Sequence, residues 1–168
     1  MRRVTAAAVA AAFTIATVGV FAQAKPSFAG KWTREAPAAD AGAAGGGGGG
    51  RGGRGGGGGF GQEPTITQDA KTLTIEYTQG QNPLKLTYTI DGESKNTMPG
   101  RGGGEPQVLT SKTAWVGSTL VITTTLANGG ERKQVLSLDG GKLVVETTQP
   151  GRDGGPGTPT KVTYTKGA

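Results

Sequence analysis

The chain of 168 residues contains no cysteine and no histidine. Without cysteine there is no disulfide, no thiol nucleophile and no cysteine to carry a lipid anchor. Without histidine, the commonest general base and the commonest ligand of transition metals are both missing, which excludes His-based catalytic triads and the usual zinc sites. We therefore expect no metal, no cofactor and no enzymatic activity, and any folded domain must be stabilised by its core alone.

The start of the chain is typical of an exported protein. Two arginines precede an apolar run from Val4 to Phe21, and the sequence Ala-Gln-Ala closes this run before Lys25. That order of charged, apolar and small residues is typical of a cleavable signal peptide, with an uncleaved membrane anchor as the alternative. We predict a signal peptide over residues 1–24, no membrane span in the mature protein, and a periplasmic or secreted location.

One internal segment consists almost entirely of glycine, alanine, proline and arginine. It covers residues 36–61 and includes uninterrupted glycine runs at 45–50 and 55–59. Such a composition has little apolar surface to bury and a high entropic cost of ordering. We predict that residues 36–61 form a disordered insertion after the first strand of a single domain over residues 25–168.

Arg51 and Arg54 lie inside this insertion in an Arg-Gly-Gly-Arg sequence. Repeats of this kind occur in RNA-binding tails, but here only two arginines are present and no aromatic residue separates them. The formal net charge of +6 names no partner by itself. We expect no nucleic-acid binding, and we assign Arg51 and Arg54 to a spacer or to contact with an envelope protein or an anionic envelope surface.

Apolar residues recur at every second position in much of the remaining chain, as between Leu84 and Ile90. This alternation predicts β-strands with one buried face and one wet face. Turn sequences such as Asp91-Gly92 join successive strands as hairpins. We predict an all-β antiparallel meander, most simply an up-and-down barrel of eight or nine strands, with an open sheet or sandwich as the alternative. The predicted strands are 28–34, 65–68, 72–78, 84–90, 107–115, 119–126, 132–138, 142–148 and 160–166.

The first predicted strand contains Gly30 and Trp32 within Phe-Ala-Gly-Lys-Trp-Thr. Gly-x-Trp at this place resembles the opening of lipocalins, fatty-acid-binding-protein-like barrels and avidins, which together form the calycin superfamily. The resemblance implies that Gly30 allows the strand to bend and that Trp32 plugs the closed end of a barrel. It also implies that a basic side chain of the last strand covers Trp32, here Lys161 or Lys166.

A second resemblance extends over most of residues 28–166 outside the glycine-rich segment. The chain resembles secreted bacterial lipocalin-like proteins in having Asp91-Gly92 after a middle strand, the hairpin Trp-Val-Gly-Ser-Thr-Leu from Trp115 to Leu120, and Tyr164 on the last strand. A second lipocalin loop signature is absent, and the last strand carries lysine where lipocalins carry arginine. The resemblance therefore implies the fold and leaves the ligand open.

Three tyrosines are candidates for contact with a ligand. Tyr77, Tyr88 and Tyr164 share the parity of aliphatic residues on their strands and so should point inward. A buried phenol hydroxyl needs a polar partner, which is either neighbouring backbone or a ligand. Together with Trp115 they form our predicted ligand-contact set, with simple core packing as the alternative for each.

These observations predict an exported lipocalin-like protein of the bacterial envelope that binds a small apolar or amphipathic ligand. The alternative is a filled barrel that acts as a protein-interaction or structural envelope module, with no small-molecule ligand and no catalysis. The volume left inside the barrel decides between the two, because inward Leu, Ile, Val and Tyr side chains can fill a small barrel completely.

Overall fold

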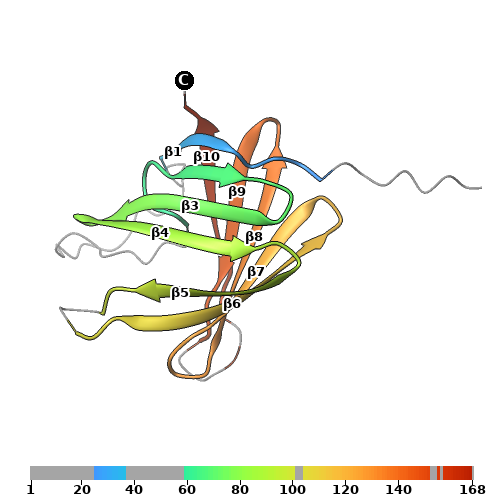
Figure 1. Cartoon of the computed structure of the whole chain (residues 1–168). Coiled ribbons are helices and arrows are strands. Elements are labelled where there is room, and N and C mark those ends of the chain that lie inside the picture. Colours follow the sequence, from blue (N-terminus) through green and yellow to red (C-terminus); the bar gives the residue numbers. More distant parts are fainter. Residues whose placement is uncertain (1–24, 37–58, 101–103, 152–154, 156, 168) are drawn as a thin grey trace, which may run out of the picture.

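A computed structural model describes residues 25–36, 59–100, 104–151, 155 and 157–167. The predicted signal peptide, most of the predicted insertion, and Arg51 and Arg54 lie outside these residues. The described part consists of strands joined by turns and loops (Figure 1). The strands are β1 (Gly30–Arg34), β2 (Thr65–Gln68), β3 (Thr72–Gln79), β4 (Asn82–Thr89), β5 (Gly92–Met98), β6 (Gln107–Val116), β7 (Thr119–Thr125), β8 (Glu131–Asp139), β9 (Lys142–Thr148) and β10 (Thr160–Lys166).

The ten strands form one antiparallel sheet in the order β4-β3-β2-β1-β10-β9-β8-β7-β6-β5. The first and last strands pair with each other, with Thr33 opposite Thr165, and the sheet curls into a nearly closed barrel (Figure 1). The two edges of the sheet are β4 and β5, which are consecutive in the chain and are joined by a tight turn at Asp91. The prediction of an antiparallel up-and-down barrel is confirmed.

The strand count is ten rather than eight or nine, because β5 was not predicted. Its sequence, Gly-Glu-Ser-Lys-Asn-Thr-Met, has a single strongly apolar residue and therefore no alternating apolar pattern. The buried position in the middle of β5 is taken by Asn96, which is 8 % exposed. Because the residue on the core-facing side is polar, a prediction based on alternating hydrophobic residues does not detect this strand.

Asn96 joins the two edges of the sheet in place of a backbone ladder. Its side-chain oxygen accepts from the Thr87 N–H at 2.8 Å, and its side-chain nitrogen donates to the Thr87 carbonyl at 3.0 Å. In the β3–β4 hairpin the Ile90 N–H donates to the Lys71 carbonyl. In an antiparallel ladder, the backbone groups of alternate residues point toward opposite neighbouring strands. The N–H and C=O of Thr87, three residues before Ile90, therefore point away from β3 and toward β5. Pro83 has the same parity on β4 and offers no N–H at this edge. The Asn96 side-chain amide thus takes the place of one pair of backbone hydrogen bonds between β4 and β5.

Replacing Asn96 with alanine should lower the free energy of unfolding by about 1–3 kcal/mol, because both Thr87 backbone groups lose their partner at a partly buried seam. Urea unfolding measures the loss, and NMR amide exchange at Thr87 should become faster. Lys95→Ala, on the exposed side of the same strand, is the control and should stay within about 0.5 kcal/mol. Unchanged exchange at Thr87 would show that the amide does not hold the seam.

The core contains a residue that the predicted insertion had included. Phe60 is 1 % exposed, and its ring centroid lies 6.0 Å from that of Tyr77. The Phe60 N–H donates to the Tyr164 hydroxyl at 2.7 Å. Residues 59–61 therefore pack on the barrel, and the prediction of disorder does not hold for them.

Candidate functional site

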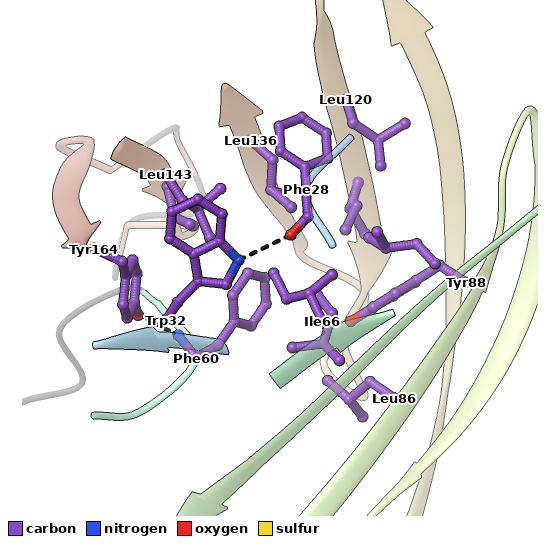
Figure 2. Packing of buried hydrophobic residues seen from close by; sticks show 14 of the residues in the cluster. Phe28, Trp32, Phe60, Ile66, Leu86, Tyr88, Leu120, Leu136, Leu143 and Tyr164 are labelled. Carbon is purple, nitrogen blue, oxygen red and sulfur yellow. Dashed lines mark hydrogen bonds between the residues drawn. The ribbon is translucent and has the colours of Figure 1, made fainter. Parts of the chain in front are cut away.

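One end of the barrel is closed by Trp32 and by the segment that precedes β1. Trp32 is 3 % exposed, and its indole N–H donates to the Phe28 carbonyl at 2.8 Å (Figure 2). The Phe28 N–H in turn donates to the Gln68 side-chain oxygen at 2.8 Å, while the Gln68 amide donates to the Pro26 carbonyl at 3.3 Å. These bonds hold the segment across the end of the barrel, which we call the plug end.

Gly30 and Lys166 complete the packing around Trp32. Gly30 has a φ of +147°, and a Cβ placed there would lie 3.0 Å from Lys166 Cε. The Lys166 ammonium lies 6.0 Å from the centroid of the Trp32 ring, within the range of a cation–π contact. Lys161 has the opposite parity on β10 and pairs in register with Glu146 on the outer face. Of the two lysines that the calycin resemblance implied, Lys166 is the one that covers the tryptophan.

Trp115 also lies at the plug end. Its ring stacks on Phe28 with centroids 5.7 Å apart and an interplanar angle of 14°. Its backbone N–H donates to Asp91 at 3.1 Å, and Lys25 lies 3.1 Å from the other Asp91 oxygen and 5.5 Å from the indole centroid. The Trp115 N–H, followed by Lys25, lowers the pKa of the Asp91 carboxyl. These contacts give Trp115 a structural role in closing this end.

The inward faces of β7 to β9 change from apolar to polar along the barrel axis. Near the plug end they carry apolar residues such as Leu120, Leu136 and Val145, all 0 % exposed. Toward the opposite end, which we call the open end, they carry hydroxyl and amide groups, and Asn96 on β5 continues this polar half. The buried polar residues are Asn96, Ser111, Thr113, Thr124, Gln134 and Thr147.

Several of these buried groups lack a hydrogen-bond partner among the described residues. The Ser111 and Thr124 hydroxyls bond each other at 2.9 Å. The unpaired buried atoms are Thr113 Oγ1, Arg132 Nε, Gln134 Oε1 and Thr147 Oγ1. Gln134 and Thr147 are cross-strand neighbours, and Gln134 and Arg132 are two residues apart on β8, so three of the four belong to one continuous patch. This unpaired polar patch is our candidate functional site.

Tyr77 and Tyr88 lie within electrostatic reach of the same patch. Burial raises the pKa of the Tyr88 hydroxyl, and the charge of Arg132 opposes this shift. The pKa of Tyr77 is raised by burial as well, and Arg132 again lowers it. Tyr88 is 1 % exposed and Tyr77 is half-buried. Two of the predicted contact residues therefore face the interior near Arg132.

Tyr164, the remaining predicted contact residue, has its hydroxyl occupied by backbone groups. The hydroxyl accepts from the Phe60 N–H at 2.7 Å and donates to the Gly61 carbonyl at 3.3 Å. A Cβ placed at Gly59 would lie 2.5 Å from the same oxygen, so glycine is required there. Tyr164 thus anchors the segment that leads into β2, and the predicted set divides between the plug end, this anchor and the polar patch.

The surface is hollowed at the open end, where β3 ends and β4 begins. An open groove of about 490 Å³ runs over β2, β3 and β4. Tyr77 and Leu84, which have inward parity, reach this groove together with Glu76 and Lys85 from the outer face, and the last two form a 2.8 Å ion pair. Most of the strand residues that line the groove have outward parity, so the groove lies on the outer face of β2 to β4.

Sequence reasoning missed Arg132, Gln134, Thr113 and Thr147. The sequence did contain a sign of two of them, because Arg132 and Gln134 occupy the same alternate positions of a predicted strand as Leu136 and should therefore point inward with it.

Within the described ranges, no group of three or more Asp, Glu, His or Cys residues could hold a metal ion. No described helix has the length and hydropathy of a membrane span.

Comparison with known proteins shows which solved structures share this fold. No protein-family model and no curated protein matches the chain. Among solved structures, the REP1-NXSQ fatty acid transporter superposes with a TM-score of 0.55 at 13 % identity, over 83 % of this chain and 96 % of that chain. The zebrafish ileal bile acid-binding protein complexed with cholic acid gives 0.51 at 17 % identity, over 83 % and 98 % of the two chains. The chain has a calycin-like fold. In this calycin-like barrel the plug end is closed by Trp32, and the unpaired polar patch faces the interior at the open end.

Proposed function

We propose that this calycin-like barrel binds a small apolar or amphipathic ligand in its interior. The observation that carries the proposal is the unpaired polar patch, which contains Arg132 Nε and the side-chain oxygens of Gln134 and Thr147. A barrel that simply filled its interior would leave these buried atoms without partners, at a cost of about 1–3 kcal/mol for each. A bound molecule, or water that such a molecule displaces, supplies the missing partners.

The similar solved structures support a ligand inside the barrel. They are a fatty acid transporter and a bile acid-binding protein in complex with cholic acid, and fatty acids and bile acids are both amphipathic. The proposal includes export to the periplasm or the medium, which rests on the signal-peptide pattern of residues 1–24. It includes no catalytic step, since the chain has neither cysteine nor histidine to serve as nucleophile or base.

Native mass spectrometry of the protein purified from a bacterial periplasm tests the proposal. The purified protein is mixed with fatty acids, sterols, quinones and oligosaccharides, and a saturable one-to-one adduct is expected with an apolar or amphipathic member. Ile122→Phe should abolish the adduct, because Ile122 is 0 % exposed and lies in register between Thr113 and Gln134. Val121→Phe, the adjacent outward position, is the matched control and should retain the adduct.

Thermal unfolding of both variants establishes that each is folded before binding is compared. A clean apo mass throughout the panel would overturn ligand binding and favour the alternative of a filled barrel. In that case the search moves to protein partners in the envelope.

A further inference from the structure

The outward-facing side chains of the barrel differ between its two sides. On β1 to β5 and on β10 the outward residues are threonine, lysine and glutamate, with one proline at Pro83. The outward valines all lie on the adjacent strands β6 to β9, at Val108, Val116, Val121, Val135 and Val144. Apolar side chains that gather on one part of a surface indicate that another molecule covers it.

Three residues in register form the centre of this apolar surface. Ala114 on β6 lies opposite Val121 on β7, and Val121 lies opposite Val135 on β8. Ala114 is exposed, and Val121 and Val135 are partly exposed. Side chains directly opposite each other on neighbouring strands are within contact distance, so the three form one continuous surface, which we call the outer strip.

Charged residues of both signs border the outer strip on β8. Lys133 lies two residues before Val135 and Asp139 lies four residues after it, and both charged side chains are exposed. The ion pairs within the described ranges join other residues, so neither Lys133 nor Asp139 has a partner there. An anionic lipid surface attracts basic side chains alone, whereas this border fits a partner that also carries both signs.

The spacing on β8 makes the surface complementary to itself. Leu136 lies three residues from Lys133 and three from Asp139, and Val135 and Ser137 flank it by one residue each. A two-fold axis that crosses β8 at Leu136, between two facing copies of the barrel, places Lys133 of each copy over Asp139 of the partner subunit. The same axis places Val135 over the small side chain of Ser137 of the partner subunit.

The neighbouring strand β7 repeats this arrangement on the same axis. Leu120 lies opposite Leu136 in register, and Val121 and Thr119 flank Leu120 by one residue each. The axis therefore also places Val121 over Thr119 of the partner subunit. Because valine faces a smaller or equally small side chain on both strands, the two outer walls can approach each other closely at β7 and β8.

We propose that the outer strip is the interface of a two-fold dimer of this chain, with β7 and β8 of each copy at its centre. Two Lys133–Asp139 ion pairs, one on each side of the axis, fix the orientation of the copies. In such an interface the same surface meets itself and every contact occurs twice. The dimer uses the outer wall of the barrel, so it goes beyond the proposed function and does not depend on a ligand in the interior.

Sedimentation velocity of the protein purified from a bacterial periplasm, over a range of concentrations, tests the interface. The wild type should sediment as a dimer at high concentration, and Val121→Glu should remain a monomer because it places a charge at the centre of the contact. Val108→Glu is the matched control, since Val108 is an outward valine of β6 that is 63 % exposed and lies outside the outer strip. It should leave the dimer intact, and thermal unfolding establishes that both variants are folded.

Charge reversal tests the two-fold arrangement. Lys133→Glu sets acidic groups against each other across the axis, and Asp139→Lys sets basic groups against each other, so each variant alone should dimerise about tenfold more weakly. A mixture of the two variants should recover the wild-type affinity as a heterodimer, because every reversed charge then meets an opposite one. Native mass spectrometry identifies the heterodimer by its mass. Lys31→Glu, at an exposed lysine of β1, is the control and should dimerise as the wild type does.

The possible outcomes are distinct. A wild type that is monomeric at every concentration, or a dimer that survives Val121→Glu, overturns the proposal. Reversed-charge variants that do not associate when mixed overturn the pairing of Lys133 with Asp139. Monomeric wild type that co-sediments with phosphatidylglycerol vesicles, when Val121→Glu does not, overturns the dimer in favour of a lipid surface. None of these results depends on whether the ligand panel yields an adduct.

Discussion

Trp32→Ala is expected to lower the free energy of unfolding by about 3–5 kcal/mol. The side chain is 3 % exposed and closes the plug end, so its removal leaves a large cavity that the surrounding strands cannot fill. The change also removes the donor to the Phe28 carbonyl. Urea unfolding followed by far-ultraviolet circular dichroism measures the loss without depending on tryptophan fluorescence.

Trp32→Phe is the matched variant for this test. It keeps an aromatic ring at the plug but removes the indole N–H, and so should cost less than the alanine change. Val116→Ala, at a side chain that is 63 % exposed near the same end, should change stability by less than about 0.5 kcal/mol. If Trp32→Ala proved as mild as Val116→Ala, the plug would not be a stabilising element.

Phe60→Ala should cost a similar amount, about 3–5 kcal/mol, although Phe60 follows a glycine-rich sequence that would ordinarily tolerate substitution. Phe60 is 1 % exposed, packs against Tyr77 and lies next to the hydrogen bond from its own N–H to Tyr164. Differential scanning calorimetry should show a melting temperature lowered by more than ten degrees, on the order of several degrees per kcal/mol.

Gln62→Ala provides the control for Phe60, since Gln62 is exposed two residues farther along the same segment. It should leave the melting temperature almost unchanged. Phe60→Leu should recover most of the stability because it restores apolar volume. A Phe60→Ala protein that melts with the wild type would mean that residues 59–61 are not part of the core.

The amino-acid sequence by itself determined the class of fold. The two-residue alternation from Leu84 to Ile90 and in the other predicted strands identifies half-buried strands, because only a β-strand turns successive side chains to opposite faces. Asp91-Gly92 and similar turn sequences predicted that successive strands pair with each other in antiparallel hairpins. Gly30 and Trp32 were predicted as the plug from their resemblance to the calycin opening, and nine of the ten strands were recognised.

Only the tertiary structure decided which polar residues lie inside. Asn96 is buried because a strand edge needs a partner for Thr87, and that need arises only when β4 and β5 meet. Phe60 enters the core because the chain returns to Tyr164, more than one hundred positions away in sequence. Gln134 Oε1 and Thr147 Oγ1, two of the buried atoms without a partner, become neighbours only because β8 pairs with β9. Local sequence records the face to which each side chain belongs, whereas the partners that a buried polar group finds depend on contacts between distant segments.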